Sequence, residues 1–207
     1  EKLVYGGLTK VFAGIVIAPI GGLIVGVLLT GLIITVFANR KPAPVNKIFG
    51  RLQIISSAWF ALTHGANDGQ KTMGIIALIL FSAGMIPELD IPLWVIFAAA
   101  AAMGLGTFFG GYKVIKTLGV KITRLRPYQG FAAETGGGLM LAAFAILGIP
   151  ASTTHAITGT IMGSGAARRK RAVRWNVSRQ IVFSWIITIP GAAGMGIGFT
   201  YLIHLFV

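Results

Sequence analysis

A polar octapeptide, HGANDGQK at residues 64–71, interrupts an otherwise apolar stretch of this sequence. Asn67 and Asp68 contribute amide and carboxylate oxygens, which suit a hard cation such as Na⁺, and the carboxylate also accepts a proton. Lys71 follows Asp68 by three residues, which is the spacing of a helical ion pair. The octapeptide therefore predicts either a site for an ion or substrate or an internal pair between Asp68 and Lys71 that locks a helix end.

A second polar segment, PASTTH at residues 150–155, carries groups that recognise anions. Pro150 precedes an expected helix start, and Ser152, Thr153 and Thr154 add hydroxyls beside the free N–H groups of a first helical turn. The positive end of a helix dipole binds anions, phosphate in particular. The alternative is ordinary capping of the helix by Ser152.

Three further polar residues accompany these segments. Glu134 is the only charged residue in 127–167, where it either pairs with a basic loop residue or faces a cavity as a coupling residue. His64 and His155 are the first and last residues of these two segments, and each is either a hydrogen-bonded structural group or has a direct role. The sequence contains no HExxH, GxSxG or Walker A motif, so an enzyme and an ATP-driven pump are not expected.

The composition is that of a membrane protein. Hydrophobic residues make up 55% of the chain and charged residues 11%, whereas soluble domains contain about 25% charged residues. Three stretches without charge, 11–38, 93–111 and 180–206, approach or exceed the roughly 20 residues that a spanning helix needs. We therefore expect an all-α, multi-pass protein of a cell membrane.

The net charge of +13 is concentrated in three short segments, 40–51, 113–126 and 168–179. Basic loops between apolar segments lie on the cytoplasmic side and contact anionic lipid headgroups. This placement argues against a nucleic-acid partner. The acidic segment 87–92 then belongs outside, and the chain crosses the membrane between these loops.

Two passages are not expected to be simple helices. The glycine-flanked GANDG sequence predicts that 52–84 forms two half-helices of about 20 Å each, with a break near the bilayer centre. In 127–167, a helix that starts only after the glycines at 136–138 reaches mid-membrane, which predicts a re-entrant hairpin with its tip at 150–155. Two full spans with an outer tip are the alternative. Broken backbone at membrane depth is typical of transporter cores.

Three motifs, HGANDGQKTMG at 64–74, FAAETGGG at 131–138 and GIPASTTHAITG at 148–159, together resemble the inorganic phosphate transporter family. The resemblance extends over nearly the whole chain. Members are secondary transporters that move phosphate with Na⁺ or H⁺, and some relatives move sulfate. The resemblance implies a cation site at Asn67 and Asp68, with Glu134 and Gln70 as coupling or structural residues. The implied phosphate-binding residues are Asp68, Lys71, Ser152, Thr153 and Thr154.

The family contains two inverted repeats, each with its own copy of the two polar motifs, and this chain has one copy of each. It therefore resembles the C-terminal repeat of a prokaryotic member, a single membrane domain over 1–207 in the plasma membrane. The resemblance implies an N-terminal half, on the same or a separate chain, and a homodimer, with no cofactor. The alternatives are a symporter for sulfate or another oxyanion, and a membrane subunit that transports nothing.

Overall fold

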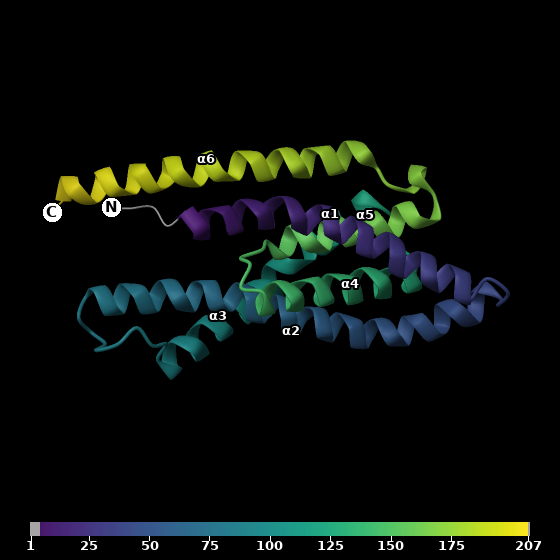
Figure 1. The fold of residues 1–207 in the computed structure, drawn as a ribbon, viewed down its shortest axis with the longest axis horizontal. Helices are drawn as coiled ribbons and strands as arrows, with labels where there is room; N and C mark the ends of the chain where they lie inside the picture. The colour runs from purple at the N-terminus through teal and green to yellow at the C-terminus, as the bar shows by residue number, and fades with distance from the viewer. Residues whose placement is uncertain (1–4, 207) are drawn as a thin grey trace. The chain divides into compact units, whose positions relative to one another are not determined.

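The computed structural model describes residues 5–206, and most of this part of the chain is helical (Figure 1). This result confirms the predicted all-α class. A short π-helical segment, Thr117–Ile122, and a 3₁₀ turn, Lys170–Ala172, lie in two of the connections. The long helices are α1 (Tyr5–Val36), α2 (Pro42–Ser82), α3 (Leu93–Lys116), α4 (Pro127–Ile146), α5 (Thr153–Arg168) and α6 (Trp175–Phe206).

Three helices in the described part of the chain are long and apolar enough to cross a membrane. Their apolar spans are Thr9–Val36, Leu93–Tyr112 and Trp175–His204, in α1, α3 and α6. They match the three uncharged stretches of the sequence. The chain divides into two compact units, one up to Val173 and one from Arg174 onward that consists of α6, and each is described by itself.

Small residues bring α1 and α5 into close contact. A Cβ atom on Gly22 would lie 2.6 Å from the carbonyl oxygen of Ala156, and one on Gly26 would meet the carbonyl oxygen of Thr160. Because the contacting positions increase together along both helices, α1 and α5 run parallel. Glycine at such positions lets two membrane helices approach to backbone contact.

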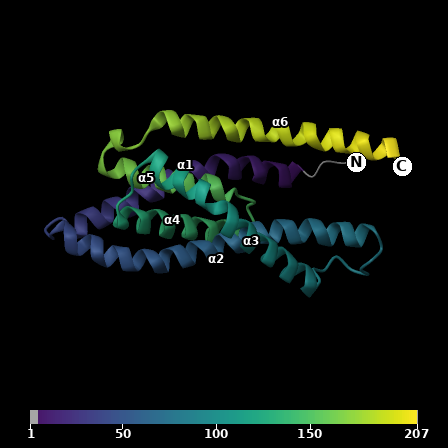
Figure 2. The ribbon, with the colours of Figure 1, turned by 180° about the vertical axis from the view of Figure 1, so that it is seen from behind.

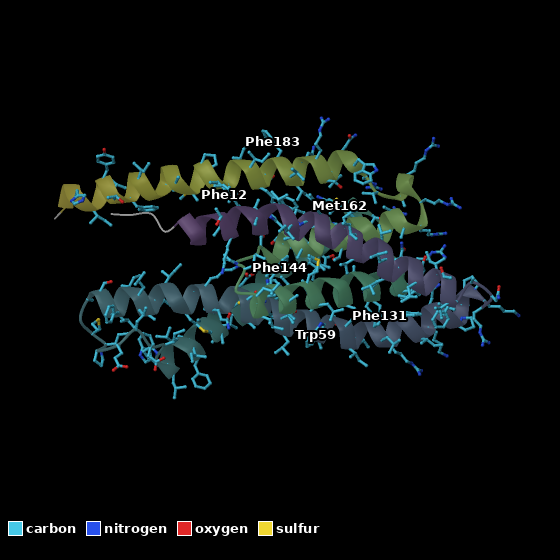
Figure 3. The ribbon with its side chains drawn as sticks, in the orientation of Figure 1. Phe12, Trp59, Phe131, Phe144, Met162 and Phe183 are labelled. Carbon is cyan, nitrogen blue, oxygen red and sulfur yellow. The ribbon has the colours of Figure 1, made fainter. Side chains whose placement is uncertain are left out.

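The α4–α5 hairpin packs its other side against α2, which runs parallel to α4 (Figure 2). The ring of Phe60 covers Gly137, and the indole of Trp59 covers Gly138. Phe144, labelled in Figure 3, is 6% exposed and belongs to the apolar core of this unit. That core also contains Ala18, Leu141, Ala151 and Ala156.

The expected break in 52–84 is wrong, because α2 is continuous from Pro42 to Ser82 and passes through Gly65 and Gly69. Glycine weakens a helix interior by about 1 kcal/mol but does not interrupt it. The polar side chains of the octapeptide find partners in α2 and in the hairpin, as described below. The backbone therefore does not have to open to satisfy them.

The expected helix start after residue 138 is also wrong, since α4 begins at Pro127 and includes the three glycines. These glycines are buried against side chains of α1 and α2, so they serve close packing. The helix ends at Ile146, and Gly148 takes a left-handed conformation with φ of 60°. The connection 147–152 then leads into α5 and forms the tip of a helical hairpin.

Candidate functional site

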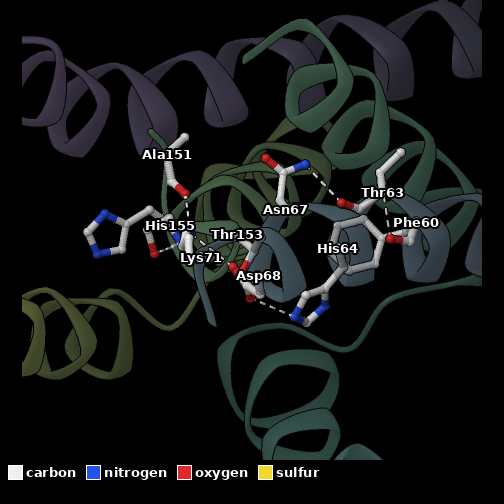
Figure 4. Close-up of polar contacts among 10 residues, drawn as sticks. Phe60, Thr63, His64, Asn67, Asp68, Lys71, Ala151, Thr153 and His155 are labelled. Carbon is white, nitrogen blue, oxygen red and sulfur yellow. Dashed lines mark hydrogen bonds and ion pairs between the residues drawn. The ribbon is translucent and has the colours of Figure 1, made fainter. Parts of the chain in front are cut away.

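The hairpin tip meets α2 at the polar octapeptide (Figure 4). In α2, His64 and Lys71 lie four residues before and three residues after Asp68, so all three side chains share one helix face. Thr153 is the first residue of α5 and is buried. The hairpin thus brings the two polar segments of the sequence together, although Asp68 and Thr153 are 85 positions apart along the chain.

Asp68 is the centre of this cluster, and both of its carboxylate oxygens have partners. The Lys71 ammonium donates to Oδ1 at 2.9 Å. The Thr153 hydroxyl donates to Oδ2 at 2.8 Å, and His64 Nε2 lies 3.0 Å from the same oxygen. The internal pair between Asp68 and Lys71 is therefore present, and Asp68 also contacts the hairpin.

Lys71 and Asn67 provide two further connections to the hairpin. Lys71 donates a second hydrogen bond, 3.0 Å long, to the carbonyl oxygen of Ala151 in the tip. The Asn67 amide donates to the carbonyl oxygen of Thr63 at 2.8 Å and to that of Leu141 in α4 at 3.4 Å. The Asn67 amide oxygen is then available to accept a hydrogen bond from a ligand or to coordinate a cation.

The other predicted residues of the site differ in their surroundings. Ser152 caps α5, with its hydroxyl accepting a bond of 3.4 Å from the His155 N–H, which is the capping role considered for it. Thr154 is exposed, one position after the buried Thr153. Gln70 lies on the exposed side of α2, outside the Asp68 cluster. His155 is buried and hydrogen-bonds the backbone of Ile15 in α1.

Glu134 belongs to a separate polar cluster. Its carboxylate accepts hydrogen bonds from Ser56 at 2.6 Å and from Gln53 at 3.3 Å, both in α2. Among the described side chains Glu134 forms no ion pair, so the alternative of a partner in a basic loop is not observed in this part of the chain. Ser56 and Asp68 are separated by about 18 Å along α2, at 1.5 Å per residue.

Sequence reasoning named His64 without its partner and missed three other contributors, Ala151, Gln53 and Ser56. The partner of His64 was recognisable from the four-residue spacing to Asp68. The Ala151 carbonyl lies in the non-helical tip, where a carbonyl group lacks a helical partner. The pairing of Gln53 and Ser56 with Glu134 depends on the alignment of α2 and α4, for which the sequence contains no local signal.

The Asp68 cluster offers oxygens for a cation next to donors for an anion. The Asp68 carboxylate, the Asn67 amide oxygen, the Thr153 hydroxyl and the Ala151 carbonyl are hard oxygen ligands of the kind that bind Na⁺. On the same tip, the N–H groups of the first turn of α5 have no partner within that helix. The Lys71 ammonium adds a positive charge to them.

Comparison with known proteins agrees with this chemistry. The chain is 48% identical over 194 residues to a probable low-affinity inorganic phosphate transporter of Rhizobium meliloti, and 39% identical over 193 residues to one of Bacillus subtilis. In both comparisons the match covers 93% of this chain and 58% of the relative. The chain thus spans a little over half the length of these relatives.

A solved structure described as the sodium-dependent phosphate transporter is also similar. Its TM-score is 0.63 at 27% sequence identity, and the match covers 87% of this chain and 54% of that one. A profile of the phosphate transporter family matches residues 35–196. These matches confirm the resemblance seen in the motifs, which is to a family of integral membrane transporters rather than of enzymes. The chain belongs to the phosphate transporter family.

Proposed function

We propose that this chain is one half of a secondary transporter that moves inorganic phosphate across a membrane together with Na⁺ or H⁺. The observation that carries the proposal is the contact of Thr153, at the start of α5, with Asp68 of α2 at 2.8 Å. It places an anion-binding helix end beside a carboxylate that can take a cation. The names of the relatives, phosphate transporters and a sodium-dependent one, support the choice of substrate and ion.

The pair of Asp68 and Lys71 suggests how the two ligands are coupled. A charge left without a partner inside a bilayer costs about 2.5–3.5 kcal/mol or more. When Na⁺ or a proton binds Asp68, it replaces Lys71 as the counter-charge and frees the ammonium group. Phosphate that binds the first turn of α5 then pairs with Lys71. The cation neutralises Asp68 and the phosphate neutralises the freed Lys71, so binding of one ligand favours binding of the other.

Phosphate fits this arrangement better than sulfate does. At neutral pH phosphate keeps at least one O–H group, which can donate a hydrogen bond to Asp68 or Asn67, whereas sulfate has none. When a ligand analogue lacks the donor that a buried acceptor needs, the acceptor stays unpaired and the analogue binds much more weakly. Competition of unlabelled sulfate against labelled phosphate tests the oxyanion alternative, and equal competition would favour it.

The depth of the hairpin tip supports alternating access through a re-entrant hairpin. Beyond Lys71, which contacts the tip, residues 72–82 of α2 continue for about 16 Å. We infer that the tip stops well short of the outer surface. A complementary half, inverted in the membrane, would supply the opposing hairpin, and rocking of the two halves would expose the site to each side in turn.

Phosphate uptake into proteoliposomes by the complete transporter tests the proposal. Uptake should follow an imposed Na⁺ or pH gradient, and Asp68→Asn should abolish that dependence. Glu88→Gln, which removes a carboxylate from an exposed connection, is the matched control and should leave uptake unchanged. Gradient-driven uptake that persists in Asp68→Asn would exclude the proposed cation role. No uptake of any oxyanion by the unaltered protein would favour a subunit that does not transport.

A further inference from the structure

A pocket of about 210 Å³ lies where α1 ends and α2 and α4 begin. One wall is apolar and is formed by Ile33, Ile34 and Phe37 at the end of α1, with Val45 of α2. This end of α1 is also the end of its membrane span at Val36. The apolar wall therefore continues the membrane-facing surface up to the boundary with water.

The rim of the same pocket is basic. It contains Arg40, from the connection between α1 and α2, and Arg126, which immediately precedes α4. Both side chains are exposed, and neither forms an ion pair with a described residue. The positive ends of the α2 and α4 dipoles meet here and outweigh the negative end of α1, so the helix ends together add to the two guanidinium groups. The rim thus favours a ligand that carries negative charge.

Two further polar groups narrow the chemistry of that ligand. The side-chain oxygen of Asn46 is buried in the pocket lining and has no hydrogen-bond partner among the described residues. As an acceptor it suits a ligand with a hydroxyl group. Tyr128, also in the lining, is an aromatic residue with a polar end, the type enriched at membrane interfaces.

We propose that this pocket binds an anionic phospholipid with a hydroxylated headgroup, of the phosphatidylglycerol type, from the cytoplasmic leaflet. The phosphodiester lies between Arg40 and Arg126, a headgroup hydroxyl donates to Asn46, and an acyl chain follows the apolar wall. Basic pockets between membrane helices on the cytoplasmic side bind such headgroups. Free phosphate would satisfy the arginines but would leave the apolar wall of Ile33, Ile34, Phe37 and Val45 unused.

The test is a titration of the complete purified transporter in detergent with phosphatidylglycerol, followed by native mass spectrometry. A basic residue near an anionic headgroup strengthens binding about fivefold, so Arg40→Gln/Arg126→Gln should weaken it about 30-fold. The control is Arg169→Gln/Arg171→Gln, which removes the same charge from another basic segment outside the pocket. It should change lipid affinity less than about twofold, a shift of under about 0.4 kcal/mol.

Ala38→Trp provides a second variant that leaves the charge unchanged. Ala38 lines the pocket and is exposed, so the indole fills the space with little effect on folding. It should weaken phosphatidylglycerol binding at least as much as the double arginine variant does. Equal losses in both arginine doubles, or unchanged binding in Ala38→Trp, would overturn the proposal. Displacement of the lipid by millimolar inorganic phosphate would reassign the pocket to small anions.

Discussion

The continuity of α2 through the polar octapeptide can be tested with glycine-to-alanine substitutions, some of which should raise the melting temperature and one of which should lower it. Gly65 lies inside the octapeptide, and a Cβ atom added there would meet no heavy atom within 4 Å. Gly74 lies nine residues further along α2 and is equally open. Gly22, in contrast, is buried, and its Cβ would lie 2.6 Å from the Ala156 carbonyl oxygen and 3.1 Å from the Thr160 amide nitrogen.

The expected magnitudes follow from these surroundings. In an uninterrupted helix, alanine is favoured over glycine by about 1 kcal/mol at both Gly65 and Gly74. For a chain of this size that gain raises the melting temperature by about 2–4 °C. At Gly22 the added methyl group meets backbone atoms that cannot rotate away. Overpacking of this kind costs about 1–3 kcal/mol, so the melting temperature should fall.

Thermal unfolding of the purified transporter in detergent, followed by the loss of its monodisperse elution peak, measures all three variants. Gly65→Ala and Gly74→Ala should both stabilise the protein, and Gly22→Ala should destabilise it. Gly74→Ala is the control, because it lies in the same helix but outside the octapeptide. If Gly74→Ala stabilises while Gly65→Ala destabilises, the helix breaks at the octapeptide and our description of α2 is incorrect.

Four further substitutions separate the roles of the polar residues. Lys71→Gln should raise the affinity for Na⁺, because the Lys71 ammonium no longer competes for Asp68, and should lower the affinity for phosphate. Binding assays with labelled sodium and labelled phosphate measure the two affinities. If both affinities rise or both fall, a cation does not replace Lys71 as the counter-charge of Asp68. Thr153→Val should weaken binding of both ions, whereas Thr154→Val should weaken phosphate binding alone; identical profiles would mean that the tip is only structural. Glu134→Gln should change the phosphate affinity less than about twofold, because Glu134 contacts α2 about 18 Å from Asp68 along the helix. The transport rate should fall in the same variant. A large loss of phosphate binding would place Glu134 in the binding site.

The helical class and the membrane spans were predictable because they depend on composition summed over long windows. The uncharged stretches at 11–38, 93–111 and 180–206 correspond to spans in α1, α3 and α6. The glycine-rich segments were interpreted incorrectly for a physical reason. A glycine in the sequence can either end a helix or allow a neighbouring helix to approach closely, and its own conformational preference is the same in both roles. Only the residue that packs against it distinguishes the two roles. At Gly137 that partner is Phe60, which lies 77 positions earlier in the chain.

The candidate site was predictable as a set of residue types but not as a set of contacts. The spacing of Asp68 and Lys71 within one helix indicates their pair, and Figure 4 shows it. The bond from Thr153 to Asp68 depends on the parallel alignment of α2 with α4 and on the length of the turn at 147–152. Neither the alignment of the two helices nor the length of this turn can be predicted from a short stretch of sequence. The same holds for Glu134, whose partners in α2 follow from the same alignment.

The contacts of the hairpin tip suggest a reason for a charge pair here instead of an apolar contact. Two bonds connect the polar groups of α2 to the tip, Thr153 to Asp68 at 2.8 Å and Lys71 to the Ala151 carbonyl at 3.0 Å. Both involve a member of the pair that a transported ion would engage. A cation at Asp68 or an anion at Lys71 therefore competes with the attachment of the tip to α2. In our proposal, ligand binding and the freedom of the hairpin to move are linked through the same atoms, a link that apolar packing would not provide.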